Sequence, residues 1–193
     1  MFDKIDDVLA DLARRLAAAA SERSSPMHVP AVVTSDVDAR GMVLREFNPD
    51  SWTLRFHTDL RAPKVAAIKA DPRMAVMFYD KPSKVQIRVR GQGRIESEGP
   101  IADKAWAESA NFARRCYLGA GPGEQSDTPT SGLPPEFEGV EPDDEQLLPA
   151  RENFAVLLIE LAEMDWFYLA HTGHVRARFE RNGDNWTGSW IAP

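Results

Sequence analysis

The spacing of hydrophobic residues changes near Val29. Before it, apolar residues from Ile5 to Leu16 recur at helical spacing, which predicts a helix over about 3–22. The Ser-Ser-Pro sequence ending at Pro26 stops this pattern, because a residue before proline is biased away from helical geometry. After it, β-branched and aromatic residues form short runs or alternate with polar residues, which predicts strands.

Short strands dominate the rest of the chain, and the turns between them are rich in Asp, Asn, Pro and Ser. The predicted strands cover residues 29–35, 41–47, 51–57, 74–79, 85–96, 154–161, 165–170, 175–181 and 186–190. Helices are predicted over 63–69 and about 101–115. Closely spaced strands with few helices favour a mainly β fold, a closed antiparallel barrel, over alternating βαβ units.

One segment differs from the rest in composition. Residues 121–150 contain eight acidic residues, six prolines and four glycines, with no Lys or Arg. Such a stretch cannot bury much apolar surface, so we predict a long loop or a partly disordered insertion within a single domain over 1–193. The net charge of −7 lies almost entirely in this segment, because the remaining chain has 23 basic and 22 acidic residues.

Composition excludes several classes of protein. The charge balance argues against a nucleic-acid binder, and no apolar run approaches the roughly 20 residues that span a bilayer. The acidic start lacks the order of a secretion signal, so we expect a cytoplasmic protein. A single cysteine excludes an internal disulfide, and His171 and His174 have no evident third ligand, so we expect no metal site.

The basic residues of the first half follow a pattern. Thr58, Arg61 and Lys64 fall where a predicted strand ends and a helix begins, which is a combination that suits a phosphate group. Arg40 and Arg45 flank another predicted strand. The alternative interpretation is that all of these side chains belong to solvated faces of barrel strands.

A second polar stripe lies on the predicted strand 85–96. Gln86, Arg88 and Arg90 alternate with Val85, Ile87 and Val89, so the three polar side chains share one face. If the strands that carry these basic groups are neighbours, the groups converge on one ligand.

The order of these motifs resembles the pyridoxamine 5′-phosphate oxidase-like, FMN-binding split-barrel superfamily. The resemblance is carried by the Arg-Gly-Met-Val-Leu-Arg run of residues 40–45, the His-Thr-Asp-Leu-Arg-Ala-Pro-Lys run of 57–64, the Val-Gln-Ile-Arg-Val-Arg-Gly run of 85–91, the helix and Pro-Gly turn of 106–123, Asp165-Trp166 and the basic run of 174–179. It covers roughly residues 27–193 and implies an antiparallel split β-barrel that binds FMN between the subunits of a homodimer.

The resemblance also implies roles for particular residues. Arg40, Thr58 and Lys64 would hold the FMN phosphate with Arg61 nearby, while Arg45 and Gln86 would approach the flavin ring. Trp166 and Arg178 would come from the other subunit. The full set of implied cofactor-binding residues is Arg40, Met42, Val43, Arg45, His57, Thr58, Arg61, Lys64, Gln86, Trp166 and Arg178.

The sequence departs from the family where a substrate would bind. His174 stands where the oxidases place a substrate-binding arginine, Arg176 stands where they place a histidine, and Pro63 replaces a second phosphate arginine. We therefore expect an FMN-dependent oxidoreductase acting on an unidentified small molecule, for which oxidation of pyridoxine phosphate is less supported than FMN binding, with His174 and Arg176 facing the substrate and no side chain assigned as catalytic. Alternatives are a non-catalytic flavin or vitamin B6 binding protein, and a haem- or deazaflavin-binding relative.

Overall fold

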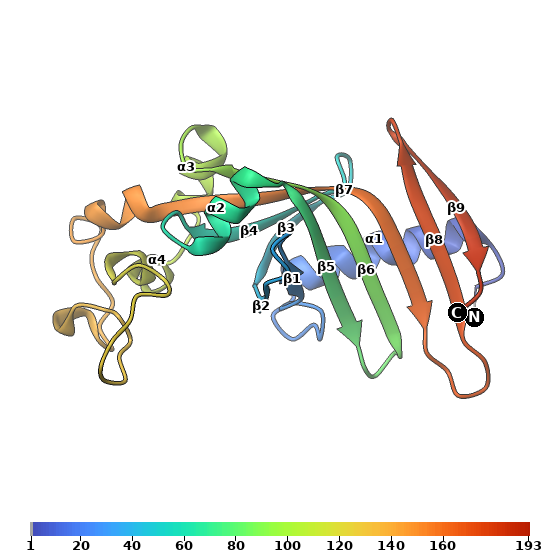
Figure 1. The fold of residues 1–193 in the computed structure, drawn as a ribbon, viewed down its shortest axis with the longest axis horizontal. Coiled ribbons are helices and arrows are strands. Elements are labelled where there is room, and N and C mark those ends of the chain that lie inside the picture. Colours follow the sequence, from blue (N-terminus) through green and yellow to red (C-terminus); the bar gives the residue numbers. More distant parts are fainter. Residues whose placement is uncertain (1) are drawn as a thin grey trace. The chain divides into compact units, whose positions relative to one another are not determined.

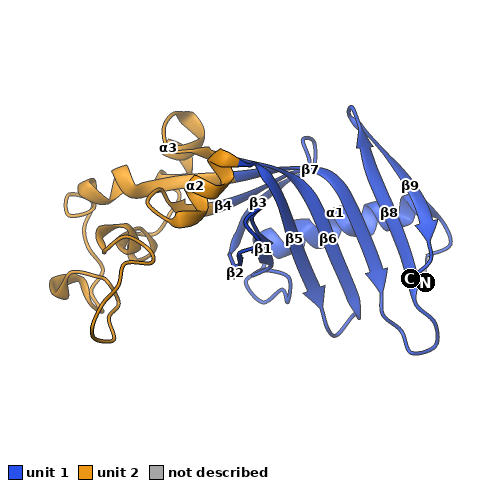
Figure 2. Ribbon diagram, in the orientation of Figure 1, with its two compact units in different colours: residues 1–56, 71–94, 158–193 blue, residues 57–70, 95–157 orange. Residues whose placement is uncertain are grey.

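A computed structural model describes residues 2–193 and divides them into two compact units. The first unit comprises residues 1–56, 71–94 and 158–193, and the second comprises 57–70 and 95–157 (Figure 2). Three strands contribute residues to both units. Each unit is described by itself below.

The described residues form one nine-stranded sheet in which every recorded pairing is antiparallel. The strands are β1 (Ala31–Val33), β2 (Ala39–Gly41), β3 (Leu44–Asn48), β4 (Thr53–Asp59), β5 (Arg73–Asp80), β6 (Val85–Glu96), β7 (Phe154–Tyr168), β8 (Val175–Asn182) and β9 (Asn185–Ile191). Their order is β2-β1-β5-β6-β7-β4-β3, and β8 and β9 extend from β7. The mainly β, antiparallel fold predicted from the sequence is confirmed.

Helix α1 (Ile5–Ser21) packs against the sheet of the first unit and contacts β3, β8 and β9 (Figure 1). Its residues Val8, Leu12 and Leu16 are fully buried, as the helical spacing predicted. On the sheet side they are matched by the inward-facing residues of β6 and β8, such as Ile87 and Phe179. This core leaves the opposite face of the sheet uncovered by α1.

Two of the strand predictions differ from the structure. The strand predicted over 41–47 is interrupted at Met42 and Val43, so β2 and β3 are separate strands. Conversely, the two strands predicted over 154–161 and 165–170 form the single 15-residue strand β7. The strand continues through the residues between the two predicted strands because the sheet holds them: Glu163 and Met164 pair with Glu180 and Phe179 of β8.

The second unit contains most of the remaining helices. These are α2 (Pro63–Ala70), α3 (Pro100–Ala107) and α4 (Asn111–Arg114), followed by 3-10 turns at Arg115–Leu118, Pro135–Phe137 and Leu148–Asn153. The helix predicted over 101–115 is therefore broken after Ala107. Residues 121–150 form a largely exposed loop with two of these 3-10 turns. No helix within residues 2–193 is both long enough and apolar enough to cross a membrane.

Candidate functional site

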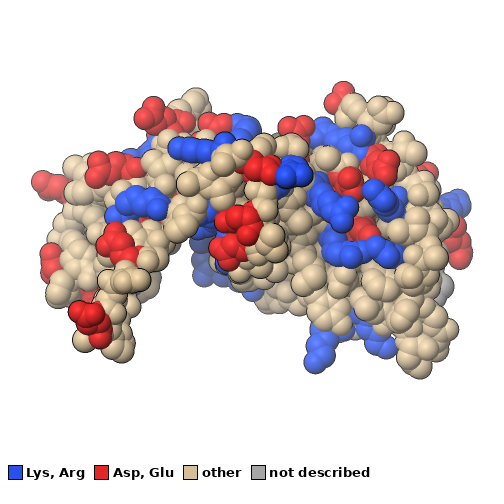
Figure 3. Space-filling model, in the orientation of Figure 1, with Lys and Arg blue, Asp and Glu red and all other residues tan. Residues whose placement is uncertain are grey.

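Side chains of opposite charge alternate across three neighbouring strands of the first unit. The indole of Trp166 on β7 donates a hydrogen bond of 3.1 Å to Asp11 of α1. Because successive residues of a strand point to opposite faces, Glu163 and Asp165 lie on the face of β7 that α1 does not cover. The space-filling view shows basic and acidic side chains gathered over these strands (Figure 3).

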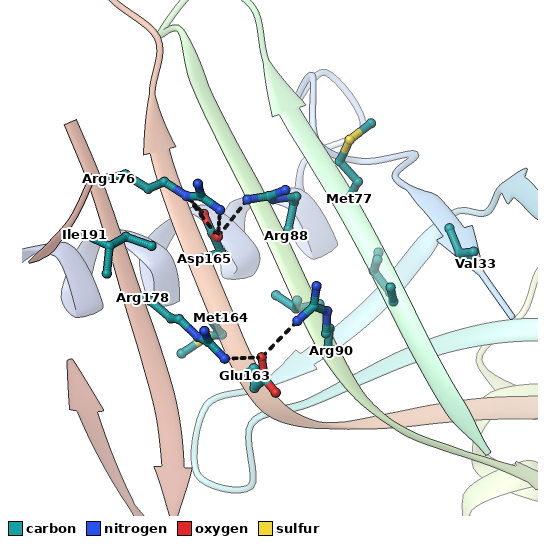
Figure 4. Close-up of a pocket in the computed structure, with 13 residues that line it drawn as sticks. Val33, Met77, Arg88, Arg90, Glu163, Met164, Asp165, Arg176, Arg178 and Ile191 are labelled. Carbon is teal, nitrogen blue, oxygen red and sulfur yellow. Dashed lines mark hydrogen bonds and ion pairs between the residues drawn. The ribbon is translucent and has the colours of Figure 1, made fainter. Parts of the chain in front are cut away.

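Six residues on β6, β7 and β8 make up this cluster, which we call the basic sheet face: Arg88, Arg90, Glu163, Asp165, Arg176 and Arg178. Asp165 accepts hydrogen bonds from Arg88 at 2.7 Å and from Arg176 at 2.6 Å. Glu163 accepts from Arg90 at 3.2 Å and from Arg178 at 3.1 Å. The figure shows the arginines of β6 and β8 meeting on the carboxylates of β7 between them (Figure 4).

The basic sheet face lines a cavity of about 250 Å³. The other lining residues are Val33, Ala75, Val76, Met77, Val89, Met164 and Ile191. Four guanidinium groups share two carboxylates, so the lining has a net charge of +2. The hydrogen bonds from Arg176 to Asp165 raise the pKa of this arginine, which keeps it fully charged. A pocket of this composition favours an anionic ligand with an apolar part.

A second group of predicted site residues lies in the second unit, around the start of α2. The Thr58 hydroxyl is buried and donates to the Asp59 carbonyl at 3.3 Å. Arg61 makes a two-pronged ion pair with Asp59, at 2.7 Å from Nη2, and also donates to the Gly119 carbonyl at 3.0 Å. These hydrogen bonds raise the pKa of Arg61.

The pairing of Arg61 with Asp59 determines what this group can bind. It neutralises the Asp59 carboxylate next to Thr58. The Thr58 hydroxyl and the Lys64 ammonium are hydrogen-bond donors, and the charge of Asp59 is already compensated by Arg61. These groups therefore fit a phosphate group. Arg61 is committed to holding the loop at Gly119 and keeps fewer donors for a ligand.

The residues predicted around β2 and β3 belong to the first unit. Arg40 on β2 pairs with Asp38 and donates to the Thr34 hydroxyl at 3.0 Å. Met42 is buried and Val43 half-buried, in the short link between the strands. Arg45 is exposed at an irregularity in the pairing of β3 with β4, where the register shifts between Leu44 and Glu46.

The remaining predicted residues are dispersed. Gln86 is half-buried on β6, opposite Tyr79 of β5. The ring of His57 meets Phe154 edge-on at 5.0 Å in the second unit. His174 is exposed in the turn between β7 and β8, with its ring 5.4 Å from Phe167. Trp166 has only 3% of its surface exposed, because its indole faces α1.

The structure thus brings Arg176 and Arg178 together with Arg88 and Arg90, which the sequence placed on one strand face. Of their partners, Asp165 was noted only as part of the Asp165-Trp166 motif and Glu163 was not noted, and neither was predicted to pair with these arginines. The alternation of Glu163 and Asp165 with apolar neighbours was the signal that could have found them, since it is the same pattern that revealed the arginines of β6.

Comparisons with known proteins show which proteins this chain is similar to. Residues 10–97 match the family model described as pyridoxamine 5′-phosphate oxidase, FMN-binding domain. The chain is 27% identical to a pyridoxine/pyridoxamine 5′-phosphate oxidase of Sphingopyxis alaskensis, over 97% of this chain and 88% of that protein.

Two solved structures share the fold over the whole chain. One is a pyridoxamine 5′-phosphate oxidase-related, FMN-binding protein from Nostoc punctiforme, with a TM-score of 0.72, 22% identity and full coverage of both chains. The other is PhzG from Burkholderia lata in complex with tetrahydrophenazine-1-carboxylic acid, with a TM-score of 0.70 and 20% identity, covering 100% of this chain and 98% of that one.

The solved structures show that the chain has a split-barrel fold. Over residues 10–97 the chain is similar to the pyridoxamine 5′-phosphate oxidase, FMN-binding domain family, which is the family that the order of its sequence motifs resembles.

Proposed function

We propose that this protein is a homodimeric, FMN-dependent oxidoreductase that acts on a small molecule in the cytoplasm. The observation that carries the proposal is the match of residues 10–97 to an FMN-binding domain. The positively charged cavity on the sheet supports it, because a charged pocket with apolar walls suits a polar, flat substrate beside a flavin.

The donor chemistry described above fits FMN. In this proposal Arg40, Thr58 and Lys64 hold the phosphate, and Arg61 keeps Asp59 neutralised beside them. Arginine suits a phosphate dianion because its planar fork donates two parallel hydrogen bonds.

Other residues orient the ring. Arg45 and Gln86 approach the isoalloxazine, where a glutamine can donate or accept a hydrogen bond without adding charge. Met42 and Val43 come shortly before Arg45 in the sequence, and His57 directly precedes Thr58. The partner subunit's Arg178 completes the site, whereas Trp166, which the sequence assigned to the same role, is buried against α1 of its own chain and takes no part in it.

Bound FMN would supply hydride transfer through its N5 atom, which is chemistry that side chains cannot provide. The residues of this chain bind and orient the reactants. Arg176 is fixed by Asp165 at 2.6 Å and so presents a stationary positive charge to an anionic substrate. The exposed His174 lies two residues before it and faces the same substrate in this proposal.

Oxidation of pyridoxine phosphate itself is not part of the proposal. The relative from Sphingopyxis alaskensis carries that name, but His174 and Arg176 of this chain stand where the oxidases place a substrate-binding arginine and a histidine. The substrate is therefore a different small molecule.

The test compares FMN with riboflavin. The purified protein should carry or take up FMN, identified by its absorbance spectrum and by mass. The double variant Arg40→Ala/Lys64→Ala should weaken FMN at least about 100-fold, because two charge-assisted contacts are lost, and riboflavin far less. Arg73→Ala, which removes an exposed arginine paired with Asp71, is the matched control.

Several outcomes contradict the proposal. Equal weakening of both flavins in the double variant means that these residues do not hold the phosphate. A colourless protein that also fails to retain added FMN refutes FMN binding altogether. An intense Soret band identifies a haem protein, and absorption at shorter wavelength than FMN identifies a deazaflavin protein.

A further inference from the structure

The basic sheet face contains two arginine pairs rather than one cluster. Asp165 holds Arg88 and Arg176 at 2.7 and 2.6 Å, and Glu163 holds Arg90 and Arg178 at 3.2 and 3.1 Å (Figure 4). On each strand the members of the two pairs are two positions apart, which is about 7 Å along a strand. The face therefore offers two separate binding points for anionic groups.

The arginines retain hydrogen-bond donors beyond those that their carboxylates use. An arginine has about five N–H donors in total. Arg88 gives Asp165 a hydrogen bond from Nη2, while its Nε is buried and meets no acceptor within residues 2–193. Leaving such a donor without an acceptor costs about 1–3 kcal/mol, and a ligand oxygen would remove that cost.

The charges of the face are not balanced by its own residues. The cavity lining has four guanidinium groups and two carboxylates, which leaves room for two negative charges. Glu180 also approaches Arg178 at 3.2 Å, but it is 65% exposed and lies outside the cavity lining, so solvent screens it. Val33, Met77 and Ile191 add an apolar edge to the same cavity.

We propose that the basic sheet face binds a small molecule with two separated carboxylates on an apolar body, one carboxylate at each arginine pair. Asp165 and Glu163 hold the like-charged guanidiniums in place before the ligand arrives. A single phosphate has its charges on one group and engages only one pair. The inference rests on the proposed function in one respect only, namely that this ligand is the substrate with which the flavin reacts.

The experiment uses terephthalate as a probe, because a rigid ring separates its two carboxylates. Isothermal titration calorimetry on the purified protein, with its flavin content measured, compares terephthalate with benzoate and with inorganic phosphate. We expect terephthalate to bind at least about tenfold more tightly than either, since a second charge-assisted contact is gained.

Two variants locate the binding. Arg88→Gln and Arg90→Gln should each weaken terephthalate about tenfold, because each removes one charged partner of a carboxylate. Arg73→Gln is the matched control, since its exposed guanidinium is paired with Asp71 outside the cavity, and it should change the affinity by less than about twofold. If a variant does not fold, the comparison of the three probes on the unaltered protein still decides the question.

The proposal is overturned if phosphate or benzoate binds as tightly as terephthalate, or if neither Arg88→Gln nor Arg90→Gln weakens terephthalate. Equal losses of FMN and terephthalate affinity in those variants also overturn it, because the face would then belong to the cofactor. A protein that binds terephthalate as expected but never binds FMN refutes the proposed function and leaves the dicarboxylate site standing.

Discussion

Asp11 is a buried acid on an otherwise apolar helix face. It has 5% of its surface exposed and accepts hydrogen bonds from Arg14, from Arg15 at 2.7 Å and from the Trp166 indole at 3.1 Å. Arg15 also pairs with Asp80 at 2.8 Å. A single carboxylate thus joins α1 to β7, and through Arg15 to the end of β5.

Removing this carboxylate leaves the buried Trp166 indole without an acceptor and leaves Arg15 with Asp80 alone. We expect Asp11→Ala to lower the free energy of unfolding by about 2 kcal/mol, because a buried donor is left unsatisfied and one ion pair of Arg15 is lost. Urea denaturation followed by circular dichroism measures the change. The exposed Asp7→Ala, in the first turn of the same helix, should cost less than about 1 kcal/mol. Equal effects of the two substitutions would contradict a structural role for Asp11.

The pairing of β6 with β7 depends on a residue without a side chain. A Cβ placed on Gly91 would lie 2.0 Å from the carbonyl oxygen of Glu160, so the two backbones approach too closely for any other residue. This contact is within the first unit, at the point where β6 and β7 pack over the core.

Gly91→Ala should therefore separate these strands and destabilise the protein by about 3 kcal/mol, which is the upper part of the range for overpacking. Gly41→Ala on β2 is the control, because its Cβ would meet only the movable Val29 side chain, at 3.3 Å. Thermal unfolding of both variants checks the difference. A Gly91→Ala protein as stable as the Gly41→Ala protein would show that the strands can shift apart at little cost.

The most buried of the side chains that hold the acidic loop of residues 121–150 is an arginine; Arg114 and Asn111 also contact the loop, each donating to Asp144 at 3.2 Å. Arg115 is 9% exposed, donates to the carbonyls of Phe137 and Val140 at 2.9 and 3.0 Å, and lies 4.0 Å from the centre of the Phe112 ring. The loop has no basic residue of its own, so its attachment depends on groups outside it.

Replacing this anchor should loosen the loop. We expect Arg115→Ala to be cleaved about tenfold faster by a glutamate-specific protease, because hydrogen bonds to a charged donor are each worth about 1.5–3 kcal/mol. Lys104→Ala, which removes an exposed basic residue of α3 in the same unit, should leave the rate unchanged. Cleavage sites are read by mass spectrometry, and unaltered cleavage in Arg115→Ala would mean that other contacts hold the loop.

Local patterns predicted the bounds of an element well where a single pattern of apolar and polar residues runs through the whole element. Strand β6 was predicted with its observed bounds because alternation runs through all of it, and α2 differed by one residue. The break between β2 and β3 was missed because Met42 and Val43 have good strand propensity, and only the pairing in the sheet separates them. Likewise Asp11 and Asp165 bind residues far away in the sequence, which no local pattern reveals.

At the scale of the whole molecule, the open face of the first unit is both charged and apolar. Met77 and Tyr79 on β5 are more than 40% exposed, and Met77 lies opposite Arg88 in the strand pairing. The cavity beside them has about 250 Å³, which is below the roughly 300–1,000 Å³ of ordinary ligand pockets. A second copy of the chain would cover the apolar residues and enlarge the pocket.

We therefore predict a homodimer. Sedimentation equilibrium at micromolar concentration should give twice the 21.5 kDa mass of one chain. Met77→Asp should shift the population toward monomer, because it places a charge where an apolar contact is expected. Val37→Asp, in an exposed loop of the same unit, is the control and should remain dimeric. A monomeric unaltered protein contradicts both the dimer and a site shared between subunits.

The two carboxylates of the basic sheet face also determine which ligands it rejects. Nucleic acids bind wherever a surface offers a dense field of unpaired arginines, and they are abundant competitors for any small anion. By giving each pair of guanidiniums a carboxylate in common, Glu163 and Asp165 reduce the net charge of the lining from four to two. In the proposed site this smaller charge would favour a small dianion over an extended polymer, so the selectivity would come from two acids that need not touch the ligand.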